Sequence, residues 1–334
     1  MRDTLPHRGI EEWKWSDLRA AVTARDPQGF DAPLNATLSG PDLSLAGPQP
    51  ASPDDLMGRI AGEYADGVTS IVVPAGAQYD KPLELRDLTT GNARIRIEVG
   101  EGASLDVREV HEGRDGFANL DLTYVVKADG TLRRSVIARD GANMIRHVRA
   151  HVTLWKGATY RQNKLTFGGA FTRLETRIAC LGAADIEMNG AYLLDGDRHA
   201  DVTHYIDFAV PGCTIRDTVA GVVTDKGRGV FQGKFHVRRP AQLTDAEMRH
   251  DALMLSDTAR INAKPELEIY ADDVECAHGN TIGQLDENAL FYMRQRGIPE
   301  AQARAMLLEA FIAARVGDDE TMLAPVREWL GARA

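Results

Sequence analysis

A glycine followed by a small residue recurs at nearly constant spacing in the middle of the chain, and this recurrence constrains the fold more than any other feature. The pairs are Gly102-Ala103, Gly130-Thr131, Gly157-Ala158 and Gly182-Ala183, so the steps are 28, 27 and 25 residues. Each glycine precedes an alternating or apolar run, such as Leu105-Asp106-Val107. Repeats of this length, each too small to bury its own apolar face, are typical of solenoids whose turns stack on one another.

Strands rather than helices fill these repeats. From Ser70 to about Thr244, short β-rich runs are broken by Gly, Asp and Asn, and a helical period is nearly absent. Stacked turns of this kind predict a right-handed parallel β-helix. A two-sheet sandwich with long hairpins produces similar texture and stays open as an alternative at this point.

Helical patterns flank the repeats on both sides. A helix is expected from Asp54 to Tyr64, with Ser52 or Asp54 as its cap, and Ser16 is expected to cap a short helix before it. After the repeats, Asp286 is expected to cap a helix that runs through Gln295. Two more helices should follow. The first carries an apolar stripe of Ala303, Met306, Leu307, Ala310, Phe311 and Ala314, and the second, from about Asp319 to Leu330, carries Met322, Leu323, Val326, Trp329 and Leu330.

The expected protein is therefore mainly β and has three parts. Residues 1–66 form a short mixed N-terminal segment that includes a helix. Residues 67–284 form the parallel β-helix core, and residues 285–334 form a C-terminal α-helical subdomain.

Charge, hydropathy and cysteine content exclude several classes of protein. The formal net charge of −10 argues against a nucleic-acid-binding surface. No stretch approaches the roughly 18 apolar residues of a membrane span, and Met1 to Gly9 lacks the apolar core of a signal peptide, so we expect a cytoplasmic protein without membrane contact. The three cysteines, Cys180, Cys213 and Cys276, are far apart and form no CxxC, which indicates neither a disulfide framework nor a zinc module.

The stretch from Leu255 to Tyr292 holds the best candidates for chemistry. Cys276 and His278 are two residues apart in a run with strand character, so they project from the same face. A thiolate and an imidazole bind transition metals, but a tetrahedral zinc site or an iron–sulfur cluster needs about four protein ligands. This stretch supplies at most two. On residue type alone, a structural role for both side chains is the more frequent outcome.

Four motifs occur in this stretch in a fixed order. They are Lys264-Pro265-Glu266-Leu267-Glu268-Ile269, Ala271-Asp272-Asp273-Val274, Cys276-Ala277-His278-Gly279, and Leu290-Phe291-Tyr292 followed by Arg296-Gly297-Ile298. Together they resemble the C-terminal signature of the SufB/SufD family, the scaffold proteins of the SUF iron–sulfur cluster assembly system. Gly279 after His278 indicates the SufD branch, because SufB-type chains carry a Glu there. The chain departs from the usual SufD pattern at Ala277, where Ser is usual, and at Asn280, where Ala is usual.

The resemblance implies a function as well as a fold. It favours the β-helix, and it implies a non-catalytic SufD-like scaffold subunit of a SufB–SufC–SufD complex. In such a complex a SufB-like subunit pairs with the last strands, and a SufC-like ATPase docks on the C-terminal helices and supplies ATP hydrolysis. The helix residues expected to face the SufC-like subunit are Phe291, Tyr292, Leu307 and Phe311.

The resemblance also implies where the cargo is held. His278 is expected to bind iron or a transient iron–sulfur cluster at the contact with the SufB-like subunit, and Cys276 is expected as an auxiliary ligand. No cofactor is expected to bind the isolated chain tightly. Whether a flavin binds the complex stays open.

Two other functions fit the residues. Six groups with ligand or acid–base chemistry lie between Gly182 and Gly233: Asp195, Asp197, His199, Asp201, His204 and Asp207. They suit a hard-metal site or a carbohydrate-active β-helix enzyme, although turn-forming Asp and partly exposed His are the more frequent outcome. A homodimeric binding protein is the other alternative, because an unpaired terminal strand can join its own copy. His147 and His151 share a strand face with Arg149, and we expect that face to be solvated.

Overall fold

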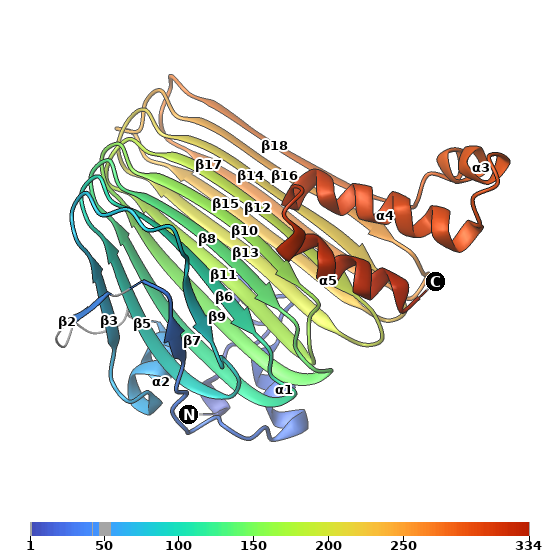
Figure 1. Ribbon diagram of the computed structural model, residues 1–334, viewed down its shortest axis with the longest axis horizontal. Coiled ribbons are helices and arrows are strands. Elements are labelled where there is room, and N and C mark those ends of the chain that lie inside the picture. The colour runs from blue at the N-terminus through green and yellow to red at the C-terminus, as the bar shows by residue number, and fades with distance from the viewer. Residues whose placement is uncertain (1, 42, 47–54, 334) are drawn as a thin grey trace.

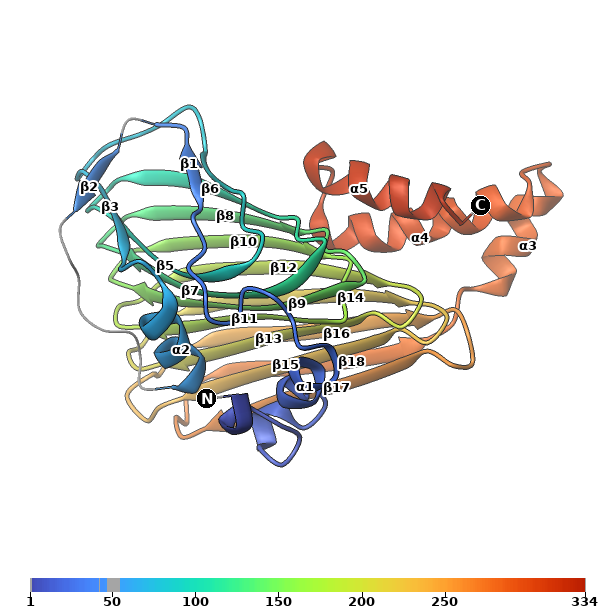
Figure 2. The same ribbon diagram turned by 90° about the horizontal axis from the view of Figure 1, so that it is seen from below.

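The computed structural model of the chain describes residues 2–41, 43–46 and 55–333. Two long sheets face each other along the molecule, and the chain crosses between them from one strand to the next (Figure 1, Figure 2). Sheet I consists of β1 (Thr37–Ser39), β4 (Leu83–Arg86), β6 (Ser104–His111), β8 (Thr131–Ala138), β10 (Thr159–Thr166), β12 (Asp185–Leu194), β14 (Thr214–Val223), β16 (Asp245–Met254) and β18 (Glu275–Gly283). Sheet II consists of β2 (Ser44–Ala46), β3 (Thr69–Val73), β5 (Gly91–Val99), β7 (Asp115–Val126), β9 (Asn143–Leu154), β11 (Phe171–Cys180), β13 (His199–Phe208), β15 (Arg228–Val237) and β17 (Arg260–Ile269).

Strands that are neighbours in space are one full turn apart in the sequence. From β3 to β18 the neighbouring strands within each sheet pair in parallel, whereas the short strands β1 and β2 pair antiparallel with β4 and β3. A sandwich of long hairpins would instead place antiparallel neighbours side by side. The prediction of a mainly β protein with a parallel β-helix and C-terminal helices is therefore confirmed, with about 8 turns in the solenoid.

The recurring glycines lie in the turns that lead into sheet I. Ser104, Thr131, Thr159 and Asp185 stack in register one coil apart, and their steps of 27, 28 and 26 residues match the expected period. Gly102 has a φ of 62°, a left-handed conformation that favours glycine because it has no Cβ. The sequence period therefore reports the length of one coil.

Later coils are longer, and the glycine spacing does not reveal them. Thr214, Asp245 and Glu275 continue the same register at steps of 29, 31 and 30 residues. The turn before Asp245 contains Leu243 in a left-handed conformation, with a φ of 59°, at the place where the turns before Ser104, Thr159 and Thr214 have a left-handed glycine. The longer coils and the missing turn glycine both interrupt the glycine spacing that marks the earlier coils in the sequence.

Inward-facing side chains form ladders that fill the solenoid. One ladder of sheet I runs through Leu105, Leu132, Tyr160, Ile186 and Ile215, all of them buried. Stacking equivalent residues of successive coils removes apolar surface from water, at roughly 25 cal/mol for each Å². The core is therefore continuous along the solenoid.

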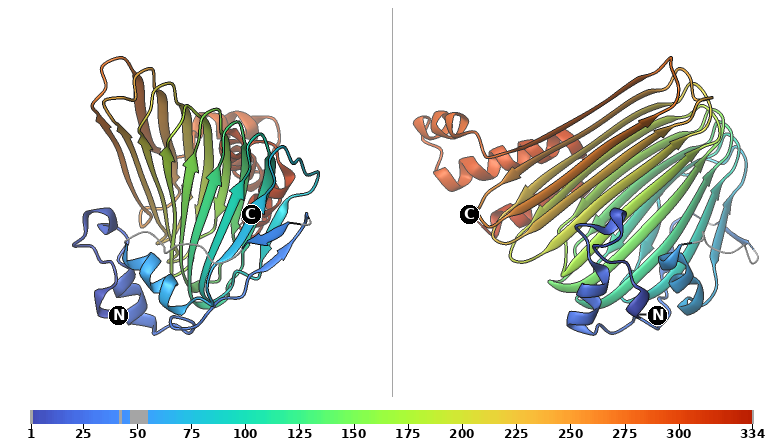
Figure 3. Two further views of the ribbon diagram at one scale, coloured as in Figure 1. Left: turned by 90° about the vertical axis from the view of Figure 1, so that its left-hand side faces the viewer. Right: turned by 180° about the vertical axis from the view of Figure 1, so that it is seen from behind.

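The N-terminal segment lies over the outer face of sheet II (Figure 3). Its helices are η1 (Arg2–Thr4), η2 (Glu11–Trp13), α1 (Leu18–Arg25) and α2 (Leu56–Tyr64). Asp17 rather than Ser16 caps α1, because its carboxylate accepts a hydrogen bond from the Ala20 backbone N–H, so the expected cap was wrong. Asp55 caps α2, and the expected caps Ser52 and Asp54 lie outside the described residues.

The C-terminal helices are α3 (Glu287–Gln295), α4 (Glu300–Val316) and α5 (Glu320–Gly331). Helices α4 and α5 lie over the outer face of sheet I, whereas α3 extends away from the sheet (Figure 1, Figure 2). Asp286 caps α3 as expected, and α5 buries the five apolar residues that the sequence predicts for one face. None of the described helices is both long and apolar enough to cross a membrane.

The apolar stripe expected on α4 was only partly correct, since Ala303, Leu307 and Phe311 pack inward but Met306 does not. The buried residues of α4 are Ala303, Leu308, Ile312 and Val316, whereas Met306 is 46% exposed. Because α4 has apolar residues on most of its circumference, its own periodicity does not select a face. Contacts with sheet I and α5 select the face that contains Leu308 and Ile312.

Candidate functional site

The two ends of the solenoid differ in how their edge strands are covered. At the N-terminal end, the three-residue strands β1 and β2 close the two sheets by antiparallel pairing. At the other end, β17 and β18 are the last strands of sheet II and sheet I, and they are ten and nine residues long. A long flat edge of this kind presents a row of backbone hydrogen-bonding groups to another chain. We call this end the open end.

Cys276 and His278 lie on β18 at the open end. Cys276 stacks on Ala246 and His278 stacks on Met248, and both partners are buried core residues of β16. The two candidate ligands therefore face the interior of the solenoid, on the coil that no further coil covers. His278 is exposed, and within the described part of the chain its imidazole has no hydrogen-bond or ion-pair partner.

The thiol of Cys276 is less available than the imidazole of His278. Cys276 is half-buried and packs against the apolar core. Burial, together with the nearby Asp245 carboxylate, raises the pKa of the Cys276 thiol. Among the described residues, no group of three or more His, Cys, Asp or Glu side chains is arranged to hold a metal ion.

A third polar residue shares this face of β18, and sequence reasoning did not assign it a role. Asn280 stacks on His250, and its Oδ1 lies 2.7 Å from Nδ1 of His250. The other ring nitrogen of His250 lies 2.9 Å from the hydroxyl of Tyr192, which is buried in the core. The signal was the alternation of β18, which predicts that positions 276, 278 and 280 face the same way.

Polar side chains also form a chain inside the solenoid. Glu109 binds Arg134, Arg134 binds Gln162, and Thr176 donates to Gln162 at 2.9 Å. Lys164 donates to Thr176 at 3.2 Å, and its Nζ lies 3.4 Å from His204. Buried polar groups of this kind require partners, and these side chains supply them to one another.

The six residues between Asp195 and Asp207 do not form one site. His199 to Phe208 is a strand, so Asp201 points outward while His204 points into the core. Asp201 binds Arg173 at 2.9 Å, and Asp207 binds Arg238 at 2.6 Å. Asp195 and Asp197 do lie in a turn, between β12 and β13. The expectation of partly exposed histidines was wrong, because both histidines lie in a strand and are buried on opposite faces.

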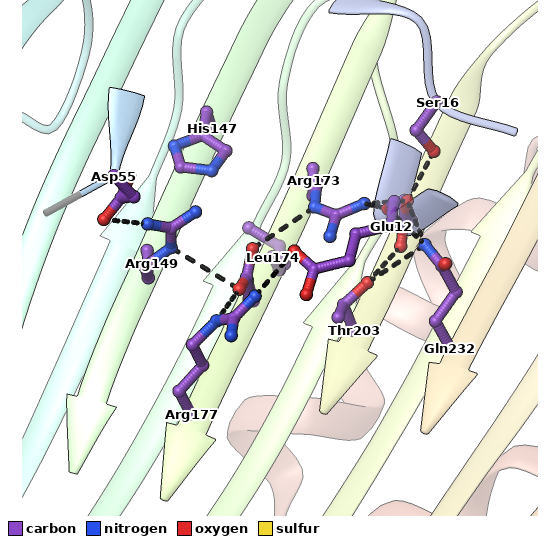
Figure 4. A network of polar contacts seen from close by, with 12 residues as sticks. Glu12, Ser16, Asp55, His147, Arg149, Arg173, Leu174, Arg177, Thr203 and Gln232 are labelled. Atoms are coloured by element: carbon purple, nitrogen blue, oxygen red, sulfur yellow. Dashed lines mark hydrogen bonds and ion pairs between the residues drawn. The ribbon is translucent and has the colours of Figure 1, made fainter. Parts of the chain in front are cut away.

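The strand face that holds His147, Arg149 and His151 is covered rather than solvated, so that expectation was also wrong. Trp13 of η2 lies on this face, with its ring centroid 5.6 Å from that of His147. The side chain of Arg149 binds Asp55, which brings the cap of α2 onto the sheet (Figure 4). Sequence reasoning missed this cover because it depends on residues more than 90 positions apart.

Glu175 is the centre of the same outer network, because its carboxylate pairs with Arg149, Arg173 and Arg177, the three arginines labelled in Figure 4. Burial alone would raise the pKa of Glu175, but Arg149, Arg173 and Arg177 hold it well below its ordinary value. Arg173 also donates to the backbone oxygen of Glu12 at 2.7 Å. This network fastens the N-terminal segment to sheet II.

The candidate partner-binding residues of the C-terminal helices differ in exposure. Phe291 and Tyr292 on α3 are 63% and 58% exposed. Leu307 and Phe311 on α4 are half-buried and pack against the cluster between the helices and sheet I. A cavity of about 560 Å³ is lined by residues of α4, α5 and the solenoid turns, and none of these four side chains is among them.

The other two cysteines lie together in the core. Cys180 ends β11 and Cys213 precedes β14, and both are buried free thiols. A hydrogen bond between the two thiols raises the pKa of Cys180 and lowers that of Cys213. No local pattern of the sequence indicates this contact, because the two cysteines are more than one coil apart.

These features define a class of protein: a parallel β-solenoid with helices on its C-terminal side and two long edge strands at one end. Residues 85–311 match the family model described as "SUF system FeS cluster assembly, SufBD core domain". The chain belongs to this SufB/SufD family, and within it to the SufD type that Gly279 indicated. Both the family and the branch were predicted correctly from the sequence.

Individual relatives agree with the family match. The iron-sulfur cluster assembly protein SufD of Escherichia coli (strain K12) is 29% identical, over 94% of this chain and 85% of the relative. The protein ABCI7, chloroplastic, of Arabidopsis thaliana is 29% identical over 77% of this chain, which spans 58% of the relative. The iron-sulfur cluster assembly protein SufD of Bacillus subtilis (strain 168) is 35% identical over 29% of this chain and 22% of the relative.

Proposed function

We propose that this chain is the SufD-like scaffold subunit of a SufB–SufC–SufD complex and has no catalytic turnover of its own. In this proposal a SufB-like subunit docks at the open end, and a nascent iron–sulfur cluster is assembled at that contact. A SufC-like ATPase docks on the C-terminal helices and supplies ATP hydrolysis. The relatives whose names record iron–sulfur cluster assembly support the general process.

The observation that carries the proposal is the pair of long edge strands at the open end. Their backbone groups and partly exposed side chains, among them Ile269 and Ile282 at 39% each, suit β-strand addition by another subunit. Soluble proteins usually protect such edges with short strands, bulges or charges. The edge strands at the N-terminal end are short, with three residues each, whereas those at the open end have ten and nine residues.

His278 is the proposed iron ligand of this subunit. It is exposed on the coil that a docked subunit would cover, and β18 also presents Cys276 on the same face. An iron–sulfur cluster needs about four ligands, so the SufB-like subunit would supply the rest. The raised pKa of Cys276 favours the protonated thiol at neutral pH, which supports an auxiliary role for it.

The proposed contact with the SufC-like subunit centres on α3. Phe291 and Tyr292 are large, exposed and adjacent, as is typical of residues that bury on binding. Leu307 and Phe311 are already half-buried within this chain, and we assign them to support of the helical subdomain in this contact.

The first prediction tests His278. The tagged chain is co-expressed with SufB-like and SufC-like subunits, purified through its tag, and reconstituted with ferrous iron and sulfide. We expect the His278→Ala complex to stay intact, because the removed side chain is exposed and has no partner within the described part of its own chain. The complex should nevertheless lose most of its iron and sulfide, because the proposed iron ligand of this subunit is missing.

His7→Ala serves as the control, since it removes a partly exposed imidazole of the N-terminal segment, far from β18 in the sequence. Iron and sulfide content, measured chemically on the purified complex, should be unchanged in this variant. Full cluster content in the His278→Ala complex would contradict the proposed role of His278. Failure of the chain to co-purify with a SufB-like subunit would contradict the proposed complex.

The same two edge strands allow a second occupant. When the SufB-like subunit is absent, a second copy of this chain can pair with the open end in a symmetric dimer. Light scattering on the isolated chain and on the co-expressed complex distinguishes the two states. If the dimer persists when a SufB-like subunit is in excess, homodimeric binding is the better account.

A further inference from the structure

A directed hydrogen-bond chain runs from the core of the solenoid to the open end. It begins at the Tyr192 hydroxyl, passes through the ring of His250 and ends at the side chain of Asn280. Tyr192 and His250 are buried, whereas Asn280 is exposed on β18, two residues from His278 and on the same face.

The hydrogen-bonding atoms of these three side chains determine which group donates and which accepts at each step. The Asn280 atom that meets His250 is the carbonyl oxygen Oδ1, which only accepts hydrogen bonds, so Nδ1 of His250 carries the proton. Burial lowers the pKa of His250, and the neutral ring then has a lone pair on Nε2 that accepts from the Tyr192 hydroxyl. With its oxygen engaged, Asn280 has its amide N–H groups left to donate at the open end.

Packing against neighbouring residues holds the rings of His250 and Tyr192 in place. The His250 ring stacks on Phe231, with centroids 4.9 Å apart and planes 2° apart. The Tyr192 ring occupies space that Gly221 leaves free, since a Cβ there would lie 2.3 Å from the ring. Both rings are therefore fixed, and the amide they orient is preorganised before any ligand arrives.

We propose that Asn280 is a second site residue beside His278, whose side-chain amide donates a hydrogen bond to a sulfide of the cluster assembled at the open end. This inference rests on the proposed function, because it places the cluster at His278. Hydrogen bonds to cluster sulfides raise the reduction potential and stabilise the bound cluster. Asn280 positions and tunes the cargo without binding iron, and Tyr192 and His250 are positioning residues behind it.

The test uses the full complex with SufB-like and SufC-like subunits, reconstituted with ferrous iron and sulfide. Asn280→Asp keeps an oxygen for His250 but removes the amide donor and adds a negative charge, whereas Asn280→Ala removes the side chain altogether. We expect normal cluster content in both variants, a lower midpoint potential in both, and the larger decrease in Asn280→Asp. Iron release to a chelator should be about tenfold faster, as for the loss of one hydrogen bond to a charged group.

Two further variants separate local effects from general ones. Asn143→Asp adds the same charge at an exposed position on β9 and should leave potential and release rate unchanged. Tyr192→Phe removes the hydroxyl that donates to His250 without altering the open end. It should lower the midpoint potential of the cluster, by less than the Asn280 variants do. Thermal unfolding verifies that each variant is folded.

The outcomes distinguish this inference from the function on which it rests. If His278→Ala loses the cluster while both Asn280 variants keep the wild-type potential and release rate, the role of Asn280 is overturned and the proposed function stands. If Asn280→Asp shifts the potential but Asn280→Ala does not, charge rather than donation is responsible, and the inference is also overturned. Full cluster content in His278→Ala would overturn the proposed function itself.

Discussion

Lys164 is an amine enclosed in the core of the solenoid. Its Nζ donates to the Leu174 backbone oxygen and to Thr176, both at 3.2 Å, and it faces His204. Burial, reinforced by the Arg134 guanidinium, lowers the pKa of Lys164 to about 7. The folded chain therefore gives up a proton that the unfolded chain keeps up to a pH near the ordinary lysine value of 10.5.

This difference predicts how stability depends on pH. Between about pH 7 and pH 10.5, the unfolded state binds the proton and the folded state does not, so the free energy of unfolding rises with pH. One proton corresponds to a slope of up to about 1.4 kcal/mol for each pH unit. Below pH 7 Lys164 is protonated in both the folded and the unfolded state, so the full cost of burying its charge lowers the free energy of unfolding.

We predict that Lys164→Met removes this contribution. Urea unfolding of both proteins at pH 7.5 and pH 9 measures it, because other titrating groups are common to both and cancel. The wild-type free energy of unfolding should rise by about 1 to 2 kcal/mol more than that of the variant over this interval. Equal changes in the two proteins would mean that Lys164 keeps an ordinary pKa in the fold.

At the scale of elements, the turns between strands carry the most specific sequence requirements. Gly182 lies in the turn between β11 and β12, where an added Cβ would lie 2.1 Å from the backbone nitrogen of Lys156. That neighbour belongs to the turn of the preceding coil, so the clash is with backbone that cannot rotate away. Gly190, on β12 itself, has its nearest neighbour at 3.5 Å from the same hypothetical atom, an ordinary contact.

We predict that Gly182→Ala and Gly190→Ala have different effects although they lie in the same coil. Gly182→Ala should lower the free energy of unfolding by about 2 kcal/mol or more, as overpacking does. Gly190→Ala should change it by less than about 1 kcal/mol, because the added methyl fits and the unfolded chain loses freedom. Urea unfolding followed by circular dichroism compares them, and equal stability of the two variants would refute the steric role of Gly182.

At the scale of the whole molecule, parts of the outer faces of both sheets are covered, whereas within the described residues no further strand covers the open end. The N-terminal segment covers sheet II through Trp13 and the Glu175 network, and α4 and α5 cover sheet I. An ion pair between Arg315 of α4 and Asp251 of β16, at 2.5 Å, joins the helices to the last coils. The unpaired edge strands therefore favour association at the open end.

We predict that a charge at the open end blocks this association. Ile282 on β18 is 39% exposed, and Ile282→Lys would bury a charge without a partner in the proposed contact, which is costly. Met306→Lys, on α4 and 46% exposed, is the matched control. Affinity for a SufB-like subunit should fall at least about tenfold in the first variant and stay unchanged in the second. Equal binding by both variants would place the contact elsewhere.

Local patterns of the sequence determined the solenoid, the length of its earlier coils, the helix cap at Asp286 and the family. These features depend on residues close together in the chain or on a regular repeat, so their physical causes can be identified from the sequence. Period-two alternation likewise placed Cys276 and His278 on one face of a strand.

Only the tertiary structure decided which faces are buried and by what. Ser16 bonds to Asp201 rather than capping a helix, His147 lies under Trp13, and Asn280 meets His250 one coil away. The sequence also did not determine the face of α4 or the contact of Cys180 with Cys213. Each of these outcomes depends on residues that are distant in the chain and that the stacking of coils brings together. No local pattern of the sequence indicates which of these residues meet.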